Sequence, residues 1–327
     1  MLLPLLIFAL GLGALYVGAD WLVRGASAIA LKLGIRPLVV GLTVVALGTS
    51  MPELLLNVFA VWSDQDALAV GNIIGSNIAN IALILGITAV LLPLVVESDA
   101  LKKEYPMMLG VTLLFWYLAS DGAVTRIDGM VLVACLVAFM VYILRTARTR
   151  PAGTVDLPLD DPDDPASGGL LARLATSNGG RALLITAGMI MLALGADLMI
   201  NSAIRIAGML GIHPGVIGLT AVAVGTSLPE LAASLVSALR KEADMSVGNV
   251  LGSNMLNIMF VVGLVALLKP MTVDAQALQI HFPIMVGFTV LLFPLAWTSS
   301  QISRGEGGLL LAGFAAYFVY LLGPYMS

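Results

Sequence analysis

The segment Gly41-Leu-Thr-Val-Val-Ala-Leu-Gly-Thr-Ser-Met-Pro-Glu53 occurs a second time, with three substitutions, as Gly218-Leu-Thr-Ala-Val-Ala-Val-Gly-Thr-Ser-Leu-Pro-Glu230. A second pair of segments follows at the same distance: Gly71-Asn-Ile-Ile-Gly-Ser-Asn-Ile-Ala-Asn80 and Gly248-Asn-Val-Leu-Gly-Ser-Asn-Met-Leu-Asn257. Both pairs are offset by 177 positions (230 − 53 and 257 − 80). The chain therefore consists of two copies of one architecture joined in tandem.

The composition is far more apolar than that of a soluble domain. Of the 327 residues, 59% are hydrophobic and 11% are charged, and the mean hydropathy is +1.01. A soluble domain carries about a quarter charged residues. We therefore expect an integral membrane protein that lies in the lipid bilayer and binds no nucleic acid.

Long apolar runs recur between short polar breaks. A helix needs about 17 to 25 residues to cross roughly 30 Å of hydrocarbon. The runs predict ten membrane-spanning helices, near 2–30, 37–62, 69–93, 104–119, 127–145, 182–208, 215–239, 246–268, 278–298 and 307–325. The amino terminus lacks the basic region and cleavage site of a signal peptide, so we expect the first span to be retained. The single cysteine, Cys135, is expected to be a small core residue.

The repeat extends beyond the two motifs, because the same offset pairs Asp20 with Asp197, Gly34 with Gly211, Pro37 with Pro214, Pro93 with Pro270 and Pro106 with Pro283. The repeat is thus five helices long. Because five is odd, the second copy enters the membrane from the opposite side. The predicted fold is an all-α membrane protein with two inverted-topology five-helix repeats, and its substrate site is expected near the midplane between them.

Three units follow from this division: a first repeat over 1–145, a linker over 146–181 and a second repeat over 182–327. The linker contains Asp160-Asp-Pro-Asp-Asp-Pro165 and is too polar to bury a core of its own. We expect a flexible cytoplasmic linker, with a weak cation-sensing role for its acidic cluster as the alternative.

Basic residues indicate the orientation. If the amino terminus is external, one face receives Lys32, Arg36, Lys102, Lys103, Arg145, Arg148, Arg150, Arg173, Arg181, Arg240, Lys241 and Arg304. That face should be cytoplasmic, because cytoplasmic loops carry an excess of Lys and Arg. Both termini then lie on the non-cytoplasmic side.

Each copy of the first motif carries a glutamate at membrane depth, Glu53 or Glu230. Such residues are costly and usually mark an ion pathway or pair with a partner, yet neither has a basic residue near it in sequence. A proline precedes each glutamate and cannot donate the helical hydrogen bond to the carbonyl four residues back. Main-chain oxygens near Thr49 and Thr226 are therefore free to bind an ion.

Further oxygens share these helix faces. They belong to Ser50 and Asn57 around Glu53, to Ser227 and Ser234 around Glu230, and in the second motif to Asn72, Ser76, Asn80, Asn249, Ser253 and Asn257. Two carboxylates with neutral oxygens suit a hard cation such as Ca²⁺. Zinc or copper would favour His or Cys, but both histidines, His213 and His281, lie at predicted helix ends.

Helix packing and structural polar contacts offer simpler interpretations of some of these residues. Gly71-x-x-x-Gly75 and Gly248-x-x-x-Gly252 fit close helix packing with Asn and Ser as interhelical contacts. Packing alone does not explain two unpaired glutamates beside two prolines. Asp20 and Asp197 also lie at membrane depth, and a structural contact, for Asp20 with Arg24 one turn on, is favoured over direct ion binding.

The two Gly-Thr-Ser-x-Pro-Glu motifs, each followed by Gly-Ser-Asn, resemble the α-repeats of the cation/calcium exchanger superfamily, and bacterial sodium/calcium antiporters most of all. The resemblance implies ten helices, with the first and sixth sliding across a core formed by the others. It also implies a bacterial inner-membrane location and competition of calcium and sodium for one cluster of sites.

Carried over by position, the calcium site would use Glu53, Glu230 and the main-chain oxygens of Thr49 and Thr226. Sodium would share the glutamates and add the hydroxyls of Ser50, Ser76, Ser227 and Ser253 and the carbonyls of Ala46 and Ala223. Asn80 and Asn257 match the central polar positions. Several relatives have aspartate at the second of these, and asparagine here puts potassium co-transport in doubt.

The resulting hypothesis is a sodium-driven calcium antiporter, with Ca²⁺ and Na⁺ as transported ions, no cofactor and no enzymatic activity. Either one Ca²⁺ or sodium ions can neutralise the two glutamates. The nearest alternative is a proton/calcium antiporter, because protons can also neutralise them. An ion channel would use the same oxygens, and an intramembrane aspartyl protease would need Asp20 and Asp197 together. The oligomeric state stays open.

Overall fold

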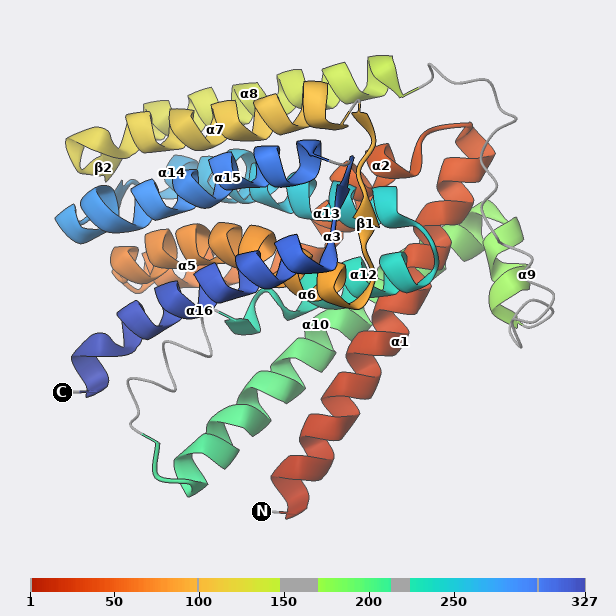
Figure 1. Ribbon diagram of the computed structural model, residues 1–327, viewed down its shortest axis with the longest axis horizontal. Helices are drawn as coiled ribbons and strands as arrows, with labels where there is room; N and C mark the ends of the chain where they lie inside the picture. The colour runs from red at the N-terminus through yellow and green to blue at the C-terminus, as the bar shows by residue number, and fades with distance from the viewer. Residues whose placement is uncertain (1, 99, 148–169, 213–223, 299, 327) are drawn as a thin grey trace.

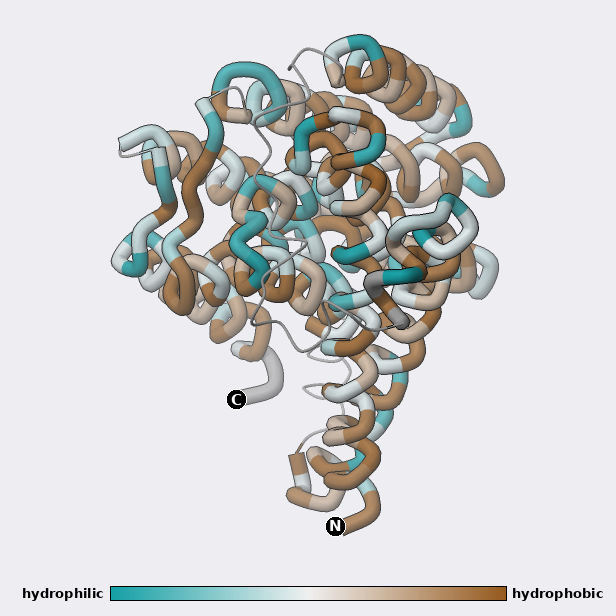
Figure 2. The backbone as a smooth tube through the Cα atoms, turned by 90° about the vertical axis from the view of Figure 1, so that its right-hand side faces the viewer, coloured by the Kyte–Doolittle hydropathy of each residue, from teal (hydrophilic) through white to brown (hydrophobic). Residues whose placement is uncertain are grey.

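The computed structural model describes residues 2–98, 100–147, 170–212, 224–298 and 300–326. This part of the chain is helical apart from four two-residue strands. Two long helices, α1 (Leu2–Leu33) and α10 (Asn178–Met209), lie side by side at an angle to the remaining helices (Figure 1). Figure 2 shows that this pair extends beyond the rest of the bundle and is mostly hydrophobic.

Glycines at seven-residue spacing bring α1 and α10 into close contact. A Cβ atom added to Gly11 would lie 2.9 Å from the carbonyl oxygen of Gly195, and one added to Gly18 would lie 2.9 Å from that of Gly188. Only residues without a side chain allow backbones to approach this closely. Because partner numbers on α10 fall as numbers on α1 rise, the two helices are antiparallel.

The first half of the remaining bundle begins with a short broken helix and continues into longer ones. Its elements are α2 (Pro37–Val40), the π-helix η1 (Gly41–Val45), α3 (Ala46–Thr49), α4 (Met51–Trp62), α5 (Asp66–Ala79), the π-helix η2 (Asn80–Ile84), α6 (Leu85–Leu91), the π-helix η3 (Ala100–Glu104), α7 (Tyr105–Leu118), the 3₁₀-helix η4 (Ala119–Asp121) and α8 (Arg126–Thr146).

The second half repeats this order where it is described. Its elements are α12 (Leu228–Leu239), α13 (Ala243–Leu256), the π-helix η5 (Asn257–Val262), α14 (Gly263–Leu268), the π-helix η6 (Ala277–His281), α15 (Phe282–Trp297) and α16 (Arg304–Met326). A further short helix, α9 (Leu170–Thr176), lies within the expected linker 146–181 and has no counterpart in the first half. The π-helices η2 and η5 begin at Asn80 and Asn257, which are equivalent positions of the second motif.

Short strands connect the halves. β1 (Leu94–Val95) pairs with β4 (Gln301–Ile302), and β2 (Ala123–Val124) pairs with β3 (Met271–Thr272), both antiparallel. Each two-stranded sheet therefore takes one strand from each repeat. The sequence did not predict these strands, because two residues are too few to show a period.

Seven helical spans of the described residues are long and apolar enough to cross a membrane: Leu2–Leu33, Asp66–Leu91, Arg126–Thr146, Asn178–Met209, Ala243–Leu268, Ala277–Trp297 and Arg304–Gly323. An eighth is formed if Pro37–Thr49 and Met51–Trp62, which meet at a 42° bend, count as one. Of the other predicted spans, 104–119 contains the 14-residue α7, and 215–239 lies partly outside the described residues.

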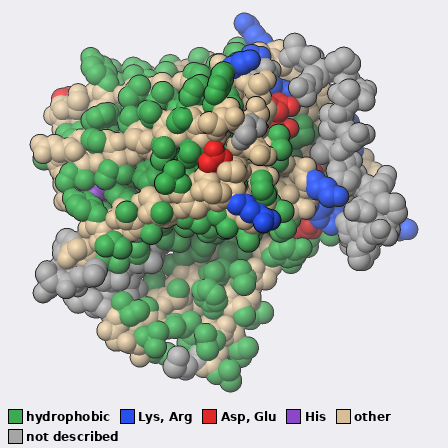
Figure 3. All heavy atoms as spheres, in the orientation of Figure 1, with side chains coloured by type: hydrophobic (Ala, Val, Ile, Leu, Met, Phe, Trp, Pro, Cys, Tyr) green, Lys and Arg blue, Asp and Glu red, His purple; other side chains and the backbone are tan. Residues whose placement is uncertain are grey.

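The spans that carry the second motif form the centre of the bundle. In the 18-residue apolar stretches of Asp66–Leu91 and Ala243–Leu268, 78% and 83% of the residues are buried, whereas the corresponding share in the other five spans is 17–28%. Gly248 and Gly252 pack directly on the backbone of α2 and η1, as the packing interpretation predicts, whereas a Cβ atom added to Gly71 or Gly75 would meet no described residue within 4 Å. On the face seen in Figure 3, hydrophobic side chains are spread along the helices, and most of the visible Lys and Arg gather at one end.

Candidate functional site

Glu53 and Glu230 occupy equivalent helix breaks. α3 ends at Thr49 and α4 begins at Met51, with Glu53 in its first turn. Ser50 at the break has φ −83° and ψ 3°, and Ser227 before α12 has φ −84° and ψ 2°. Each break is followed by a proline in the first helical turn, as the sequence predicts. The two motifs thus adopt the same local structure.

The two glutamates come together in the bundle interior. Both are 0% exposed. The hydroxyl of Ser50 donates to Oε1 of Glu230 at 3.3 Å, across 180 residues of sequence. The two carboxylates lie close enough for their charges to repel each other. Two like charges in one buried place favour a bound cation between or beside them.

The first motif of each half contacts the second motif of the other half. Thr49 Oγ1 lies 3.4 Å from Ser253 Oγ and donates to Asn249 Oδ1 at 3.4 Å. In the mirrored arrangement, Thr226 Oγ1 lies 3.3 Å from Ser76 Oγ and donates to Asn72 Oδ1 at 3.1 Å. Tertiary contacts that the sequence spacing does not reveal therefore join the hydroxyls of the two repeats.

Asn77 and Asn254 are polar residues that sequence reasoning did not assign to the site. Asn80 donates its amide to Asn254 Oδ1 at 3.0 Å, and Asn257 donates its amide to Asn77 Oδ1 at 3.1 Å. These bonds fix the amide groups and leave the carbonyl oxygens of Asn80 and Asn257 as acceptors. The signal was present in the repeated Gly-Ser-Asn, whose last residue is Asn77 or Asn254.

Several buried oxygens around the glutamates have no hydrogen-bond partner within the described part of the chain: both carboxylate oxygens of Glu53, Oε2 of Glu230, Oγ of Ser227, and Oδ1 of Asn80 and Asn257. Leaving such a group unsatisfied costs about 1–3 kcal/mol, and more when it is charged. Neither glutamate forms a salt bridge with a described residue. A cation bound at the two carboxylates would supply the counter-charge that they lack.

Other residues of the motifs hydrogen-bond to the backbone and side chains around the glutamates. Asn57 donates to the main-chain oxygen of Glu53 at 2.7 Å, and Asn249 donates to Ser234 Oγ at 2.9 Å. Ala46 is buried, and its carbonyl oxygen accepts from the Ser50 amide at 3.0 Å. Ala223, its repeat equivalent, lies outside the described residues.

The donor set is made of oxygen. Among the described residues, no group of three or more His, Cys, Asp or Glu side chains could hold a metal ion. The cluster instead combines two carboxylates with hydroxyl and amide oxygens, which hard cations accept and soft metals do not favour. The arrangement can therefore bind a cation such as Ca²⁺ or Na⁺.

Asp20 and Asp197 do not form a pair. Asp20 binds Arg24 at 2.9 Å, which was the expected contact, and Asp197 accepts from Asn201 at 2.8 Å. In the antiparallel register, Asp20 lies opposite Gly188, which is nine residues or about 13 Å from Asp197 along α10. This separation excludes a two-aspartate protease centre.

Comparison with known proteins places the chain among ion exchangers. The family described as sodium/calcium exchanger protein matches residues 3–145 and 181–323. The chain is 37% identical over 327 residues to the putative antiporter CaxA of Alkalimonas amylolytica, covering 98% of this chain and 99% of that protein. It is 32% identical over 341 residues to the sodium/calcium exchanger MaX1 of Methanosarcina acetivorans, covering 97% of each.

Similarity extends to a bacterial inner-membrane protein and to solved structures. The inner membrane protein YrbG of Escherichia coli is 36% identical over 329 residues, with 99% of each chain covered. The sodium-calcium exchanger NCX_Mj, in a structure soaked with Na⁺ and Ca²⁺, superimposes with a TM-score of 0.79 at 32% identity, with 98% of each chain covered.

Proposed function

The chain belongs to the sodium/calcium exchanger protein family, and from that premise we propose that it is a sodium-driven calcium antiporter. It is an integral membrane protein of the antiporter type. The family consists of transporters and not enzymes, and the ions these proteins carry take the place of a cofactor. Sodium as the coupling ion and the glutamate cluster as the transport site are the proposed parts.

One observation carries the site assignment: Glu53 and Glu230 are fully buried, close together and without a counter-charge among the described residues. Calcium would bind both carboxylates and the main-chain oxygens of Thr49 and Thr226. One Ca²⁺ matches the two negative charges. Without a bound cation, the doubly negative cluster would be costly to move through the bilayer. Only the ion-loaded forms would then switch between opening to one side of the membrane and opening to the other, and this requirement would couple the exchange of the two ions.

Sodium is favoured over protons because the cluster contains more oxygens than protonation requires. Protons would need only the two carboxylates. Sodium would add Ser50, Ser76, Ser227 and Ser253 and the carbonyls of Ala46 and Ala223, with Asn80 and Asn257 at the centre. The mutual contacts of Ser76 with Thr226 and of Ser253 with Thr49 support this assignment. A proton/calcium antiporter remains the second candidate.

The proposed architecture is ten membrane helices in two inverted five-helix repeats, 1–145 and 182–327, joined by the linker 146–181. The antiparallel packing of α1 on α10, which are equivalent helices of the repeats, supports opposite orientations. The strand pairs also support opposite orientations. The repeat relates β1 to β3 and β2 to β4, so it converts the β1–β4 pair into the β2–β3 pair. α1 and α10 would slide across the remaining helices.

Charge distribution supports the proposed orientation. Most Lys and Arg on the visible face gather at one end of the bundle (Figure 3), and such residues are retained on the cytoplasmic side. Both termini would then lie on the opposite side. In a bacterial inner membrane, an inward sodium gradient would drive extrusion of Ca²⁺ from the cytoplasm.

Transport in sealed liposomes tests the proposal. Ca²⁺ uptake is measured with an outward Na⁺ gradient, and with H⁺ or K⁺ gradients for comparison. We expect uptake with Na⁺ alone, and we expect Glu53→Gln and Glu230→Gln to abolish it. Asp197→Asn is the matched control, because it removes a repeated carboxylate that lies exposed on α10. Uptake with H⁺ alone would select the second candidate, and no coupled uptake would refute both.

A further inference from the structure

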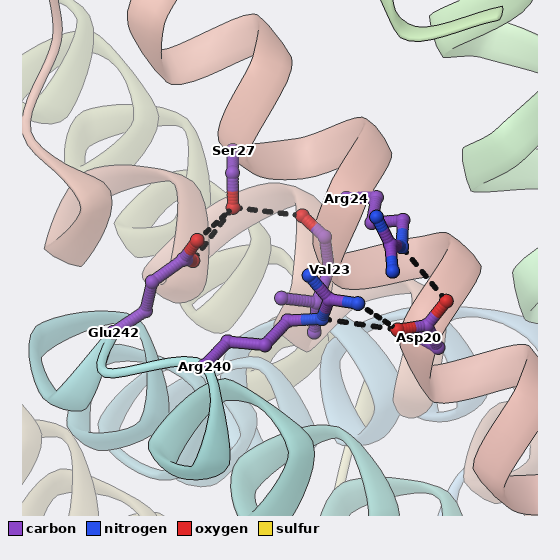
Figure 4. Close-up of polar contacts among 6 residues, drawn as sticks. All are labelled: Asp20, Val23, Arg24, Ser27, Arg240 and Glu242. Carbon is purple, nitrogen blue, oxygen red and sulfur yellow. Dashed lines mark hydrogen bonds and ion pairs between the residues drawn. The ribbon is translucent and has the colours of Figure 1, made fainter. Parts of the chain in front are cut away.

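A polar interface fastens α1 to the turn between α12 and α13. In Figure 4, Ser27 faces Glu242 and Asp20 faces Arg240. Ser27 Oγ lies 2.7 Å from Glu242 Oε1 and 2.6 Å from Oε2, and both residues are buried. Asp20 forms ion pairs with Arg240 and, at 2.9 Å, with Arg24. We call these five residues the α1 latch.

The latch has no equivalent in the other repeat. Asp20 keeps its counterpart in Asp197, but the positions equivalent to Arg24, Ser27, Arg240 and Glu242 hold Asn201, Ile204, Ser63 and Gln65. The packing of α12 also differs from that of α4, its equivalent in the first repeat. Val236 of α12 is 5% exposed in a cluster with residues of α1, whereas its equivalent on α4, Phe59, is 68% exposed. The bundle is thus closed at the latch end.

Proton counting around Ser27 identifies the form of Glu242 that fits this geometry. The Ser27 hydroxyl has one hydrogen, but three acceptors surround it: both Glu242 oxygens and the main-chain oxygen of Val23, at 2.8 Å. A protonated Glu242 supplies the missing hydrogen. It donates to Ser27 Oγ, which then donates to Val23. If Glu242 were ionised, its buried charge would receive at most one hydrogen bond from Ser27, and Val23 would compete for the same hydrogen.

We propose that Glu242 is a proton-binding site, separate from the glutamate pair of the transport site, whose protonation closes the α1 latch. The consequence for ion exchange rests on the proposed antiport function. With the latch end on the cytoplasmic side, acidification of the cytoplasm would favour the state that is closed there. Ions would then reach the transport site from that side more slowly.

The electrostatic surroundings of Glu242 are consistent with a neutral carboxyl group. Burial raises its pKa to about 7, while the Ser27 hydrogen bond and the charge of Arg240 oppose that rise. Arg240 is itself held by Asp20. Other charged residues on the elements that pack around the turn are Arg24 on α1, Lys241 in the turn, Asp244 on α13 and Arg36 at the start of α2, which binds Glu97 and Glu104.

The direction of the pH effect follows from linkage. The closed latch holds its proton with a pKa near 7, whereas an exposed carboxyl has a pKa of 4.5. The population of the closed state therefore rises relative to that of the open state as pH falls from 7 towards 4.5. Within this window, each pH unit changes the closed-to-open ratio by up to about tenfold. Above pH 7 the ratio stays at its lowest value.

Spin-label distances in lipid nanodiscs test the latch without measuring transport. Labels are placed on the full chain, with Cys135→Ser, at Leu33→Cys near the end of α1 and Leu239→Cys at the end of α12. Both positions are exposed. Distance distributions are recorded from pH 5 to pH 8 at constant Na⁺ and Ca²⁺. We expect the short-distance population to grow as pH falls.

Variants assign the response to the latch. Glu242→Gln, which resembles the neutral form, should keep the short distance at every pH. Ser27→Ala should reduce the short population at pH 5, and Asp197→Asn should leave the pH response unchanged. A parent chain without a pH response, or a Glu242→Gln chain that retains one, would overturn the proposal. Because the readout is a distance, failure of sodium–calcium exchange would leave this test intact.

Discussion

The hydroxyl of Ser50 lies 3.3 Å from Oε1 of Glu230 and donates to it, so a side chain of the first repeat serves the carboxylate of the second. The site is therefore formed by side chains from both repeats. A ligand that neutralises Glu230 changes what the Ser50 hydroxyl can do, because the serine is a donor to a free carboxylate and an oxygen ligand to a bound cation.

This contact predicts different effects of Ser50→Ala on the two ions. Sodium, which is proposed to use the hydroxyl, should lose a ligand, and its half-saturating concentration should rise about tenfold, equivalent to about 1.4 kcal/mol. Calcium, which is proposed to use the carboxylates and main-chain oxygens, should change less. Liposome flux at varied Na⁺ and Ca²⁺ measures both. Ser120→Ala, which removes an exposed hydroxyl, is the control. Equal losses for the two ions would contradict the assignment.

Asn77 is predicted to orient Asn257 for ion binding. Asn77→Ala removes the acceptor at 3.1 Å from the Asn257 amide and frees that side chain to rotate. A buried hydrogen bond lost in this way costs about 1–3 kcal/mol, so Na⁺ binding, which is proposed to have Asn257 at its centre, should weaken by about tenfold while the protein stays folded. The Na⁺ concentration that gives half-maximal exchange in liposomes measures this affinity. Asn201→Ala on α10 is the control, and an unchanged affinity for Asn77→Ala would remove Asn77 from the site.

The glycine seam between α1 and α10 is predicted to be necessary for their close packing. In Gly18→Val the Cβ atom would lie 2.8 Å from the Leu192 amide nitrogen, so the two backbones must separate. We expect loss of transport and a lower melting temperature. Gly13→Val is the matched control, because an added Cβ meets nothing within 4 Å there. Thermal unfolding in detergent, followed by fluorescence, compares them. Similar melting temperatures would show that the seam is not essential.

The sequence predicted the family, the membrane location and the local structure of the motifs, because these depend on composition and on repeated short-range patterns. Pro52 and Pro229 are visible in the sequence, and the helix breaks beside them follow from proline chemistry. The separation of the halves by 177 positions likewise required only comparison of the chain with itself.

Contacts between helices could not be predicted in the same way. The pairing of Thr49 with Ser253 and of Thr226 with Ser76 depends on the register between helices of different repeats, which spacing within one helix does not contain. Ser27 and Glu242 are 215 positions apart and belong to no shared motif. Such residues become recognisable only when the fold brings buried polar atoms together.

The raised pKa of Glu242 predicts a pH-dependent stability effect. Its carboxyl has a pKa of about 7 in the folded protein and 4.5 when unperturbed, so the folded state loses stability as pH rises from 4.5 to 7. The loss is at most about 3.5 kcal/mol, at about 1.4 kcal/mol per pH unit. Glu242→Gln cannot ionise and should therefore raise the melting temperature at pH 8 but have little effect at pH 4.5. Melting curves of both chains at the two pH values test this. A gain of equal size at both would mean that Glu242 does not bind its proton in the folded state.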